Sequence, residues 1–229
     1  ASDAGGDEVA LRHTDAAIAM RKQLGPWGVT LSAEQGETVS GAAMRRQAEM
    51  AGRSRREDVA TYGVSVDRSL GDLDVALGLD WMNEEDTLLG ARFHDAFGLQ
   101  GARTLFVDAS LAWHLAAGWT LGAAFRQGRT TARDGGLVAA GSHLASRAWS
   151  LDLDRRGVFS ASDRIGVRES QPLRVEGGAL NLNLPVAYSY DTLVPEYGVR
   201  SLTLAPRGRE LLGEVTWSGP ILSGEGTAS

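Results

Sequence analysis

Apolar and polar residues alternate over much of the chain. In seven segments every second residue is apolar and the residues between are mostly small or polar: residues 27–34, 73–81, 104–114, 119–126, 149–154, 180–190 and 211–217. Successive side chains of a β-strand point to opposite faces, so each segment has one apolar face and one more polar face. Weaker alternation at residues 16–21, 59–67, 164–171 and 202–205 brings the expected number of strands to about eleven.

The connections between these segments alternate in length. Residues 25–26, 70–72 and 116–118 are short links, whereas residues 35–58, 83–102 and 130–143 are long ones. Glycine and proline mark the short links as turns. An antiparallel up-and-down meander, with short turns at one rim and long loops at the other, has this pattern. We expect one helix, at residues 40–52, inside the first long loop.

Composition narrows the class of protein. The 229 residues include no run of about 18 apolar residues, so we expect no transmembrane helix, although strands that cross a membrane are marked by alternation instead. Cysteine is absent, which excludes disulfides and thiolate metal sites. The net charge of -6 and a pI near 5.3 argue against a nucleic-acid partner.

The apolar faces are rich in aromatic residues near strand ends. A soluble β-sandwich also alternates, with its apolar face turned inward. Aromatic girdles at the two membrane interfaces are instead typical of an outer-membrane barrel, as are strands with roughly 8–11 residues of alternation. We therefore predict membrane-interface positions for Trp27, Trp81, Trp113, Trp119, Trp149, Tyr188, Tyr190 and Trp217.

The polar faces combine small residues with scattered charges. Glycine, alanine and serine dominate them, whereas a solvated sheet exterior usually carries more lysine, glutamate and threonine. This composition suits a wet lumen that holds a plug or a strand of polypeptide. The side chains predicted to line that lumen are Asp80, Asp108, His114, Arg126, Asp152 and Arg168. For His114 a lumen position is favoured over a role as a ligand.

Several stretches resemble a known family. They are Gly25-Pro26-Trp27, residues 71–90 (GDLDVALGLDWMNEEDTLLG) and 110–128 (SLAWHLAAGWTLGAAFRQG), residues 142–159 and 170–175, and Leu182-Asn183-Leu184-Pro185. Over residues 15–217 the chain is similar to the C-terminal β-domain of subtilisin-like serine protease autotransporters of sphingomonad-type α-proteobacteria. These are framework residues and include no catalytic motif.

The resemblance implies an all-β fold: an antiparallel meander of about eleven strands that forms an outer-membrane-type β-barrel. It implies a single translocator-like domain over residues 1–229, with residues 1–14 as a linker to an N-terminal passenger. The implied location is the bacterial outer membrane. The implied partners are outer-membrane lipid and lipopolysaccharide, the chain's own N-terminal passenger and the barrel-assembly machinery.

Two departures from the family limit these expectations. Members continue past the position of Ser229 with further strands and normally end in an aromatic residue, so edge strands are expected to be lacking and this chain alone need not close a barrel. The subtilisin passenger, with its Gly-Thr-Ser-Met segment, is not in the sequence. Protease activity is therefore not expected of this chain.

The sequence contains few candidate catalytic or binding motifs. The sequence has no HExxH, no GxSxG and no P-loop, so we expect no catalytic residues, no metal site and no cofactor. Residues 83–86, Asn-Glu-Glu-Asp, cluster carboxylates that suit either a divalent cation or a solvated acidic turn. The basic residues Arg45, Arg46, Arg53, Arg55 and Arg56 suit either lipopolysaccharide phosphates or a solvated charged loop.

The sequence thus favours a translocator or anchor domain that has no chemistry of its own. A soluble all-β accessory binding module of a secreted protease, either secreted or periplasmic, remains the alternative. A barrel enzyme that acts on lipid is a third reading.

Overall fold

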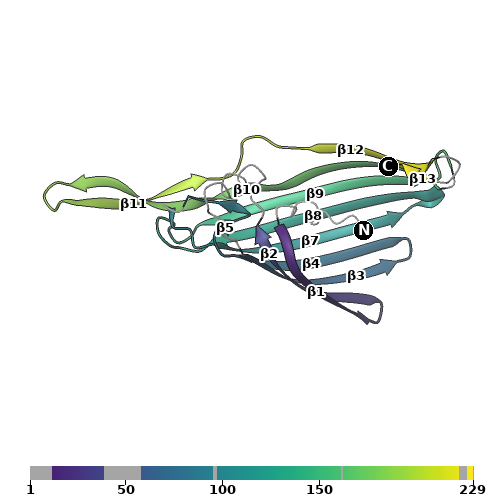
Figure 1. Ribbon diagram of the computed structural model, residues 1–229, viewed down its shortest axis with the longest axis horizontal. Coiled ribbons are helices and arrows are strands. Elements are labelled where there is room, and N and C mark those ends of the chain that lie inside the picture. Colours follow the sequence, from purple (N-terminus) through teal and green to yellow (C-terminus); the bar gives the residue numbers. More distant parts are fainter. Residues whose placement is uncertain (1–11, 39–57, 95–96, 161, 222–225, 229) are drawn as a thin grey trace.

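The computed structural model describes residues 12–38, 58–94, 97–160, 162–221 and 226–228 (Figure 1). The helix expected at residues 40–52 and the basic loop that contains Arg45 and Arg56 lie outside the described residues.

One large antiparallel sheet dominates the structure. Within the described residues eleven strands form it, with a separate two-stranded ribbon beside it. The sheet contains β1 (Arg12–Leu24), β2 (Trp27–Thr38), β3 (Asp58–Leu70), β4 (Leu73–Glu84), β7 (Ala102–His114), β8 (Trp119–Ala132), β9 (His143–Arg156), β10 (Arg164–Ser189), β11 (Val194–Thr203), β12 (Leu212–Ile221) and β13 (Gly226–Ala228); the ribbon contains β5 (Thr87–Leu88) and β6 (Ala91–Arg92). The predicted all-β antiparallel meander is confirmed.

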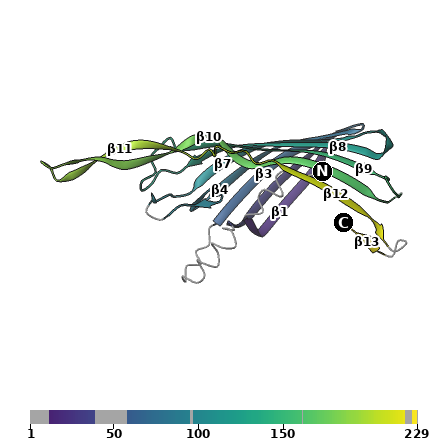
Figure 2. The same ribbon diagram turned by 90° about the horizontal axis from the view of Figure 1, so that it is seen from above.

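The sheet is curved and open. Seen from above, β1 and β12 bend to the same side of the central strands (Figure 2). The order runs β1-β2-β3-β4-β7-β8-β9-β10-β12-β13, and β11 pairs with β10 alone. No pairing between described residues joins β1 to β12 or β13, so the sheet is not closed into a barrel here. Its two edges therefore carry backbone groups that no described strand pairs.

Short and long connections occupy opposite ends of the sheet. Residues 25–26, residues 71–72 and the 3-10 turn Ala116–Gly118 link strands at one end, which we call the short-turn rim. Residues 85–101 and 133–142 link strands at the other end, the long-loop rim. Gly25 and Gly71 have φ of 61° and 64°, a left-handed conformation that glycine adopts without strain. For the connections that the structure describes, the predicted alternation of short and long links is confirmed.

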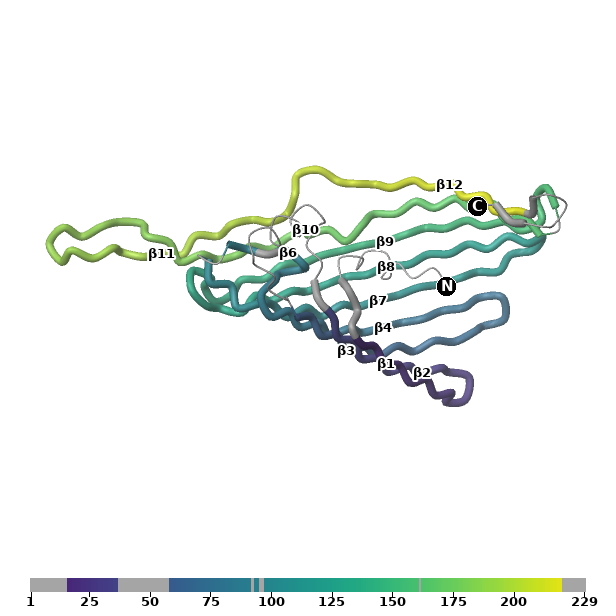
Figure 3. Tube along the Cα trace, in the orientation of Figure 1, coloured from purple at the N-terminus to yellow at the C-terminus, as the bar shows by residue number. Residues whose placement is uncertain are grey.

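Strand β10 is longer than the alternation indicates. Residues 164–171 and 180–190 look like separate strands in the sequence, but β10 runs unbroken for 26 residues. Register shifts at Gln171/Arg174 and Val175/Gly177 join the two parts. Pro172 sits in the first shift, where a bulge leaves residues out of the ladder and a missing N–H costs no bond. The far part of β10 pairs with β11 and projects from the sheet as a hairpin (Figure 3).

The two faces of the sheet differ in exposure. We call the face that carries Asp80, Asp108 and Arg126 the inner face; it comprises the even-numbered positions of β4, β7, β8 and β9. The outer face comprises the odd-numbered positions of these strands. Phe106 on the inner face is 5% exposed, whereas Leu77 on the outer face is 65% exposed.

Loop residues cover the inner face at the long-loop rim. Leu88 of β5 and Val138 pack with inner-face residues in the main apolar cluster, which also contains Ala102, Leu144, Leu180 and Leu182. Glu84, at 1% exposure, anchors this loop. It accepts hydrogen bonds from the hydroxyl of Thr87 at 2.8 Å and from the amides of Leu89 and Gly90 at 2.9 and 2.7 Å. Within residues 83–86, the Glu84 carboxylate is therefore buried and hydrogen-bonded to the loop, and it is not part of a solvated turn.

Substitution of Gly101 tests how closely the loop of residues 85–101 approaches the end of β4. Its φ is +86°, and an added Cβ would collide with the carbonyl oxygens of Glu84 and Glu85. Gly71 also has positive φ, but a Cβ there meets nothing within 4 Å. We expect Gly71→Ala to lower the free energy of unfolding by about 1–2 kcal/mol through backbone strain alone. Gly101→Ala should cost clearly more, as measured by urea titration of tryptophan fluorescence; equal losses would contradict this packing.

Candidate functional site

Small residues on the inner face make room for charged side chains. A Cβ added at Gly63 would collide with the carboxylate of Asp80, and one added at Gly166 would lie 2.6 Å from Oδ1 of Asp154. A Cβ at Gly28 would meet the Arg21 guanidinium. The small residues that the sequence places between the apolar ones thus lie where cross-strand ion pairs need space.

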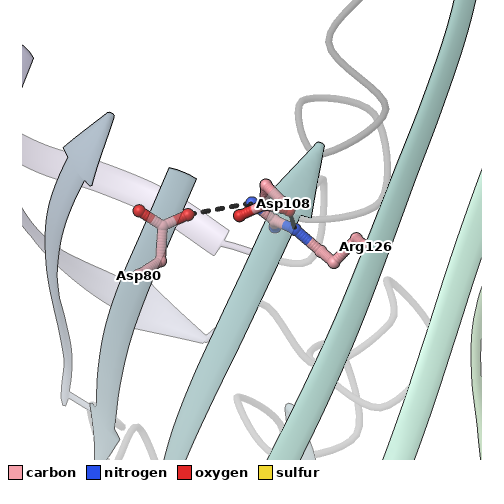
Figure 4. A network of polar contacts seen from close by, with 3 residues as sticks. All are labelled: Asp80, Asp108 and Arg126. Carbon is pink, nitrogen blue, oxygen red and sulfur yellow. Dashed lines mark hydrogen bonds and ion pairs between the residues drawn. The ribbon is translucent and has the colours of Figure 1, made fainter. Parts of the chain in front are cut away.

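A three-residue cluster lies at the centre of the inner face (Figure 4). The Arg126 guanidinium on β8 reaches Asp108 on β7 and Asp80 on β4. Its Nη2 lies 2.9 Å from Asp80 Oδ2 and 3.1 Å from Asp108 Oδ2, and its Nε also donates to Asp108. The guanidinium also lies over the ring of Phe106, 4.9 Å from its centroid. The Arg126 side chain is 11% exposed, so solvent screens this cluster only in part.

The other residues predicted to line the lumen also lie on the inner face. Arg168 Nε is 3.5 Å from Oδ1 of Asp152, its cross-strand neighbour. His114, near the short-turn rim, places Nε2 3.0 Å from Oδ2 of Asp74. The six predicted residues therefore share one face but form three separate groups.

Sequence reasoning missed further ion pairs on this face. Arg21 on β1 binds Asp67 on β3, and Arg164 on β10 has its Nη2 2.8 Å from Oδ2 of Asp154. Alternation indicates that these residues face the polar side. It does not show which residue each one meets, because cross-strand partners depend on register.

The inner face is polar without a large excess of either charge. Each of the ion pairs named above joins an arginine or histidine to a carboxylate on another strand, either the adjacent strand or the next one along the sheet. Within the described residues no group of three or more His, Asp or Glu is placed to hold a metal ion. Such a surface can hydrate and can exchange hydrogen bonds with another polypeptide.

The outer face carries most of the predicted interface aromatics. Trp27, Trp81, Trp113 and Trp217 are 42–48% exposed, and Trp119 and Trp149 are half-buried. At the short-turn rim Arg68 lies over Trp27 and Arg155 over Trp119, at 5.0 and 5.2 Å from the ring centroids.

Tyr188 and Tyr190 lie apart from the other predicted interface aromatics. Tyr188 is on the projecting part of β10 and Tyr190 follows it at the hairpin turn. The two rings meet edge to face, with centroids 5.2 Å apart. They extend the aromatic surface beyond the body of the sheet.

Asp163 closes the turn between β9 and β10. Its carboxylate accepts hydrogen bonds from the amides of Val158 and Phe159, both at 2.8 Å. Burial raises the pKa of this carboxyl, but the amides of Phe159, Ser160 and Val158 and the side chain of Trp217 outweigh it, so the net pKa is lowered. The lowered pKa ties the ionised side chain to the folded turn.

Comparisons with family models, with curated proteins and with solved structures give no match for this chain. The family resemblance therefore stays a prediction. Among the described residues, no helix has the length and apolar character needed to cross a membrane.

Removing the Arg126 guanidinium from the central cluster should destabilise the fold. Arg126→Met leaves the carboxylates of Asp80 and Asp108 on neighbouring strands without this guanidinium. We expect a loss of about 2 kcal/mol in the free energy of unfolding at neutral pH, below the 3–5 kcal/mol of a fully buried pair because water reaches the site. Denaturant titration measures it. The matched control, Asp80→Asn/Asp108→Asn/Arg126→Met, also removes both carboxylates and should recover most of the lost stability. If the triple variant is as unstable as Arg126→Met, repulsion between the two carboxylates is not the cause of the loss.

The turn at Asp163 predicts a pH dependence. Because the folded pKa lies below its ordinary value of 3.8, the ionised carboxylate contributes stability that is complete above that value. That contribution is lost as the pH falls through the lowered folded pKa. Asp163→Asn should therefore be less stable than the parent at neutral pH and should approach it in acid. Denaturant midpoints measured across this range test it, and a difference that is constant with pH would contradict it.

Proposed function

We propose that this chain is an outer-membrane β-barrel translocator or anchor domain of the autotransporter type, which aids secretion or surface display of an N-terminal protease passenger. The observation that carries the proposal is the inverted polarity of the sheet: its outer face is apolar and exposed, while its inner face is polar and less exposed.

The outer face has the composition of a lipid-facing surface. Exposed aliphatic residues occur on six of its strands: Leu31 on β2, Val64 on β3, Leu77 and Leu79 on β4, Val107 and Leu111 on β7, Leu151 and Leu153 on β9, and Val215 on β12. Their exposures range from 37% for Val64 to 76% for Val215. Soluble proteins rarely leave so continuous an apolar surface uncovered. Contact with acyl chains accounts for it without a second protein layer.

Strand length also supports the proposal. A tilted strand needs about 9–11 residues to cross the hydrocarbon core of a bilayer. β3 and β7 have 13 residues each, and β8 and β9 have 14 each. Each is therefore long enough to cross and to extend into both interfaces.

In the bilayer every backbone polar group needs a partner, so the sheet edges at β1 and at β12 and β13 must be paired in the working assembly. The inner face would then line a wet path. Its paired charges would hydrate an extended passenger without holding it at one strong site.

Adjacent residues on β7 test the orientation. Leu111 lies on the outer face and is 40% exposed, whereas Ser110 lies on the inner face. We expect Leu111→Arg to impair folding into lipid vesicles, at about 2–4 kcal/mol if it lies near the midplane. Ser110→Arg, which adds the same charge to the same strand, should fold as the parent does. The measurement is the fraction of the 229-residue chain that shows heat-modifiable mobility on an SDS gel.

A parallel refolding in buffer without detergent separates the alternatives. The proposal expects aggregation there and a heat-modifiable band with detergent or vesicles. A monodisperse monomer in plain buffer, unaffected by Leu111→Arg, would overturn the proposal and favour the soluble accessory module.

A further inference from the structure

We propose that a row of outward-facing arginines, Arg103, Arg129 and Arg147, binds the phosphate groups of the phosphorylated glycolipid in the outer leaflet of the outer membrane. The proposal rests on the membrane orientation proposed above. It adds a specific lipid site on the chain's own surface, which we call the arginine row.

The three arginines lie on adjacent strands and on one face. They occupy odd-numbered positions of β7, β8 and β9, which belong to the outer face, and all three are exposed. Arg129 pairs with Leu105, two residues from Arg103, and with Ala145, two residues from Arg147. Diagonal neighbours of this kind have Cα atoms about 7–8 Å apart, which is within reach of long side chains. The three guanidinium groups can therefore approach one or two phosphates together.

The arginine row differs from the inner-face arginines in its partners. Arg126 and Arg164 bind carboxylates on neighbouring strands. No ion pair joins Arg103, Arg129 or Arg147 to any carboxylate within the described residues. Instead, Arg147 lies over the ring of Phe125 at 5.7 Å from its centroid. Exposed cations above an apolar surface suit an anionic ligand.

Arg147 also faces a like charge. Its direct cross-strand neighbour on β10 is Arg174. Like charges directly opposite each other destabilise a sheet. Arg174 donates to the carbonyl oxygen of Pro206 at 2.6 Å and lies 4.0 Å from Glu176. A phosphate next to Arg147 would offset the remaining repulsion.

The surroundings indicate a lipid and not a free anion. Apolar residues of the outer face lie on the short-turn side of the arginines. The next outer-face residue is Leu105 on β7 and Trp149 on β9, whereas on β8 Gln127 comes first and Phe125 follows it. A bound lipid could place its phosphates on the guanidinium groups and its acyl chains against these apolar side chains. Arginine pairs with phosphate through two parallel hydrogen bonds, which favours such a headgroup.

The position of the arginine row along the strands indicates which membrane leaflet it contacts. The arginine row lies near the long-loop rim, since Arg103 is the second residue of β7 and Arg147 the fifth of β9. Long loops of outer-membrane barrels face the outside, and short turns face the periplasm. The headgroup within reach is then the phosphorylated glycolipid and not the glycerophospholipid of the inner leaflet.

The test compares lipid binding by two variants of equal charge. The first is Arg103→Gln/Arg129→Gln/Arg147→Gln. The control, Lys22→Gln/Arg156→Gln/Arg200→Gln, removes three exposed cations elsewhere. The full chain, refolded in a neutral detergent, is titrated with bisphosphorylated lipid A, phosphatidylglycerol and inorganic phosphate, and bound lipid is counted by native mass spectrometry. Heat-modifiable mobility is recorded for each sample.

We expect lipid A to bind the parent and the control alike, and the first variant about 100-fold more weakly, because each arginine near a membrane surface contributes roughly fivefold. Phosphatidylglycerol and inorganic phosphate should bind the parent more weakly than lipid A. A variant with lysine at all three positions should keep part of the affinity, since it retains charge but not paired hydrogen bonds.

Three results would overturn the arginine row as the site. They are equal lipid A binding by the first variant and the control, equal binding of phosphatidylglycerol and lipid A, and absence of lipid A binding by the parent. If the parent shows heat-modifiable mobility in these samples, only the lipid site is ruled out and the proposed membrane orientation stands. If it is not, and the parent is a soluble monomer in plain buffer, the proposed function fails as well.

Discussion

The register of the antiparallel ladder is the constraint on which the rest of this structure depends. A shift of one residue in any pairing would turn every side chain of that strand to the opposite face. With the observed register Asp108 lies opposite Arg126, and Leu77 lies opposite Ala109. The paired charges at the centre of the sheet, Asp80, Asp108 and Arg126, therefore lie on one face, and the exposed aliphatic side chains lie on the other. The short turns at Gly25 and Gly71 hold this register at one rim.

The arginines of the two faces differ in their partners. On the inner face Arg126, Arg168 and Arg164 all meet carboxylates from neighbouring strands, so their charge is balanced within the sheet. On the outer face Arg103 and Arg129 have no such partner among the described residues, and Arg147 contacts an aromatic ring. Internal pairing suits a surface that must stay hydrated without attracting ions. Unpaired cations above apolar residues suit an interface between lipid and water.

In the membrane orientation proposed above, the unpaired backbone groups at the two edges of the sheet need partner strands. A curved sheet with two free edges is stable in lipid only when those edges pair with further strands.

Two segments extend beyond the single layer of the sheet. The loop that Glu84 anchors covers the inner face at the long-loop rim, where Leu88 and Val138 join the apolar cluster. The projecting β10–β11 hairpin leaves Tyr190 and Tyr197 at 83% and 56% exposure.

By itself the sequence determined the all-β class, the meander and the two kinds of rim, because alternation and turn residues are local signals. It also placed Asp108, Arg126 and the tryptophans on the correct faces, since parity within a strand needs no knowledge of its neighbours. Only the tertiary structure decided which residues meet: that Arg126 reaches two strands across to Asp80, that Pro172 lies in a bulge of one long strand, and that Arg147 faces Arg174. These depend on register and bulges between segments far apart in the chain, which the cooperative pairing of the whole sheet sets.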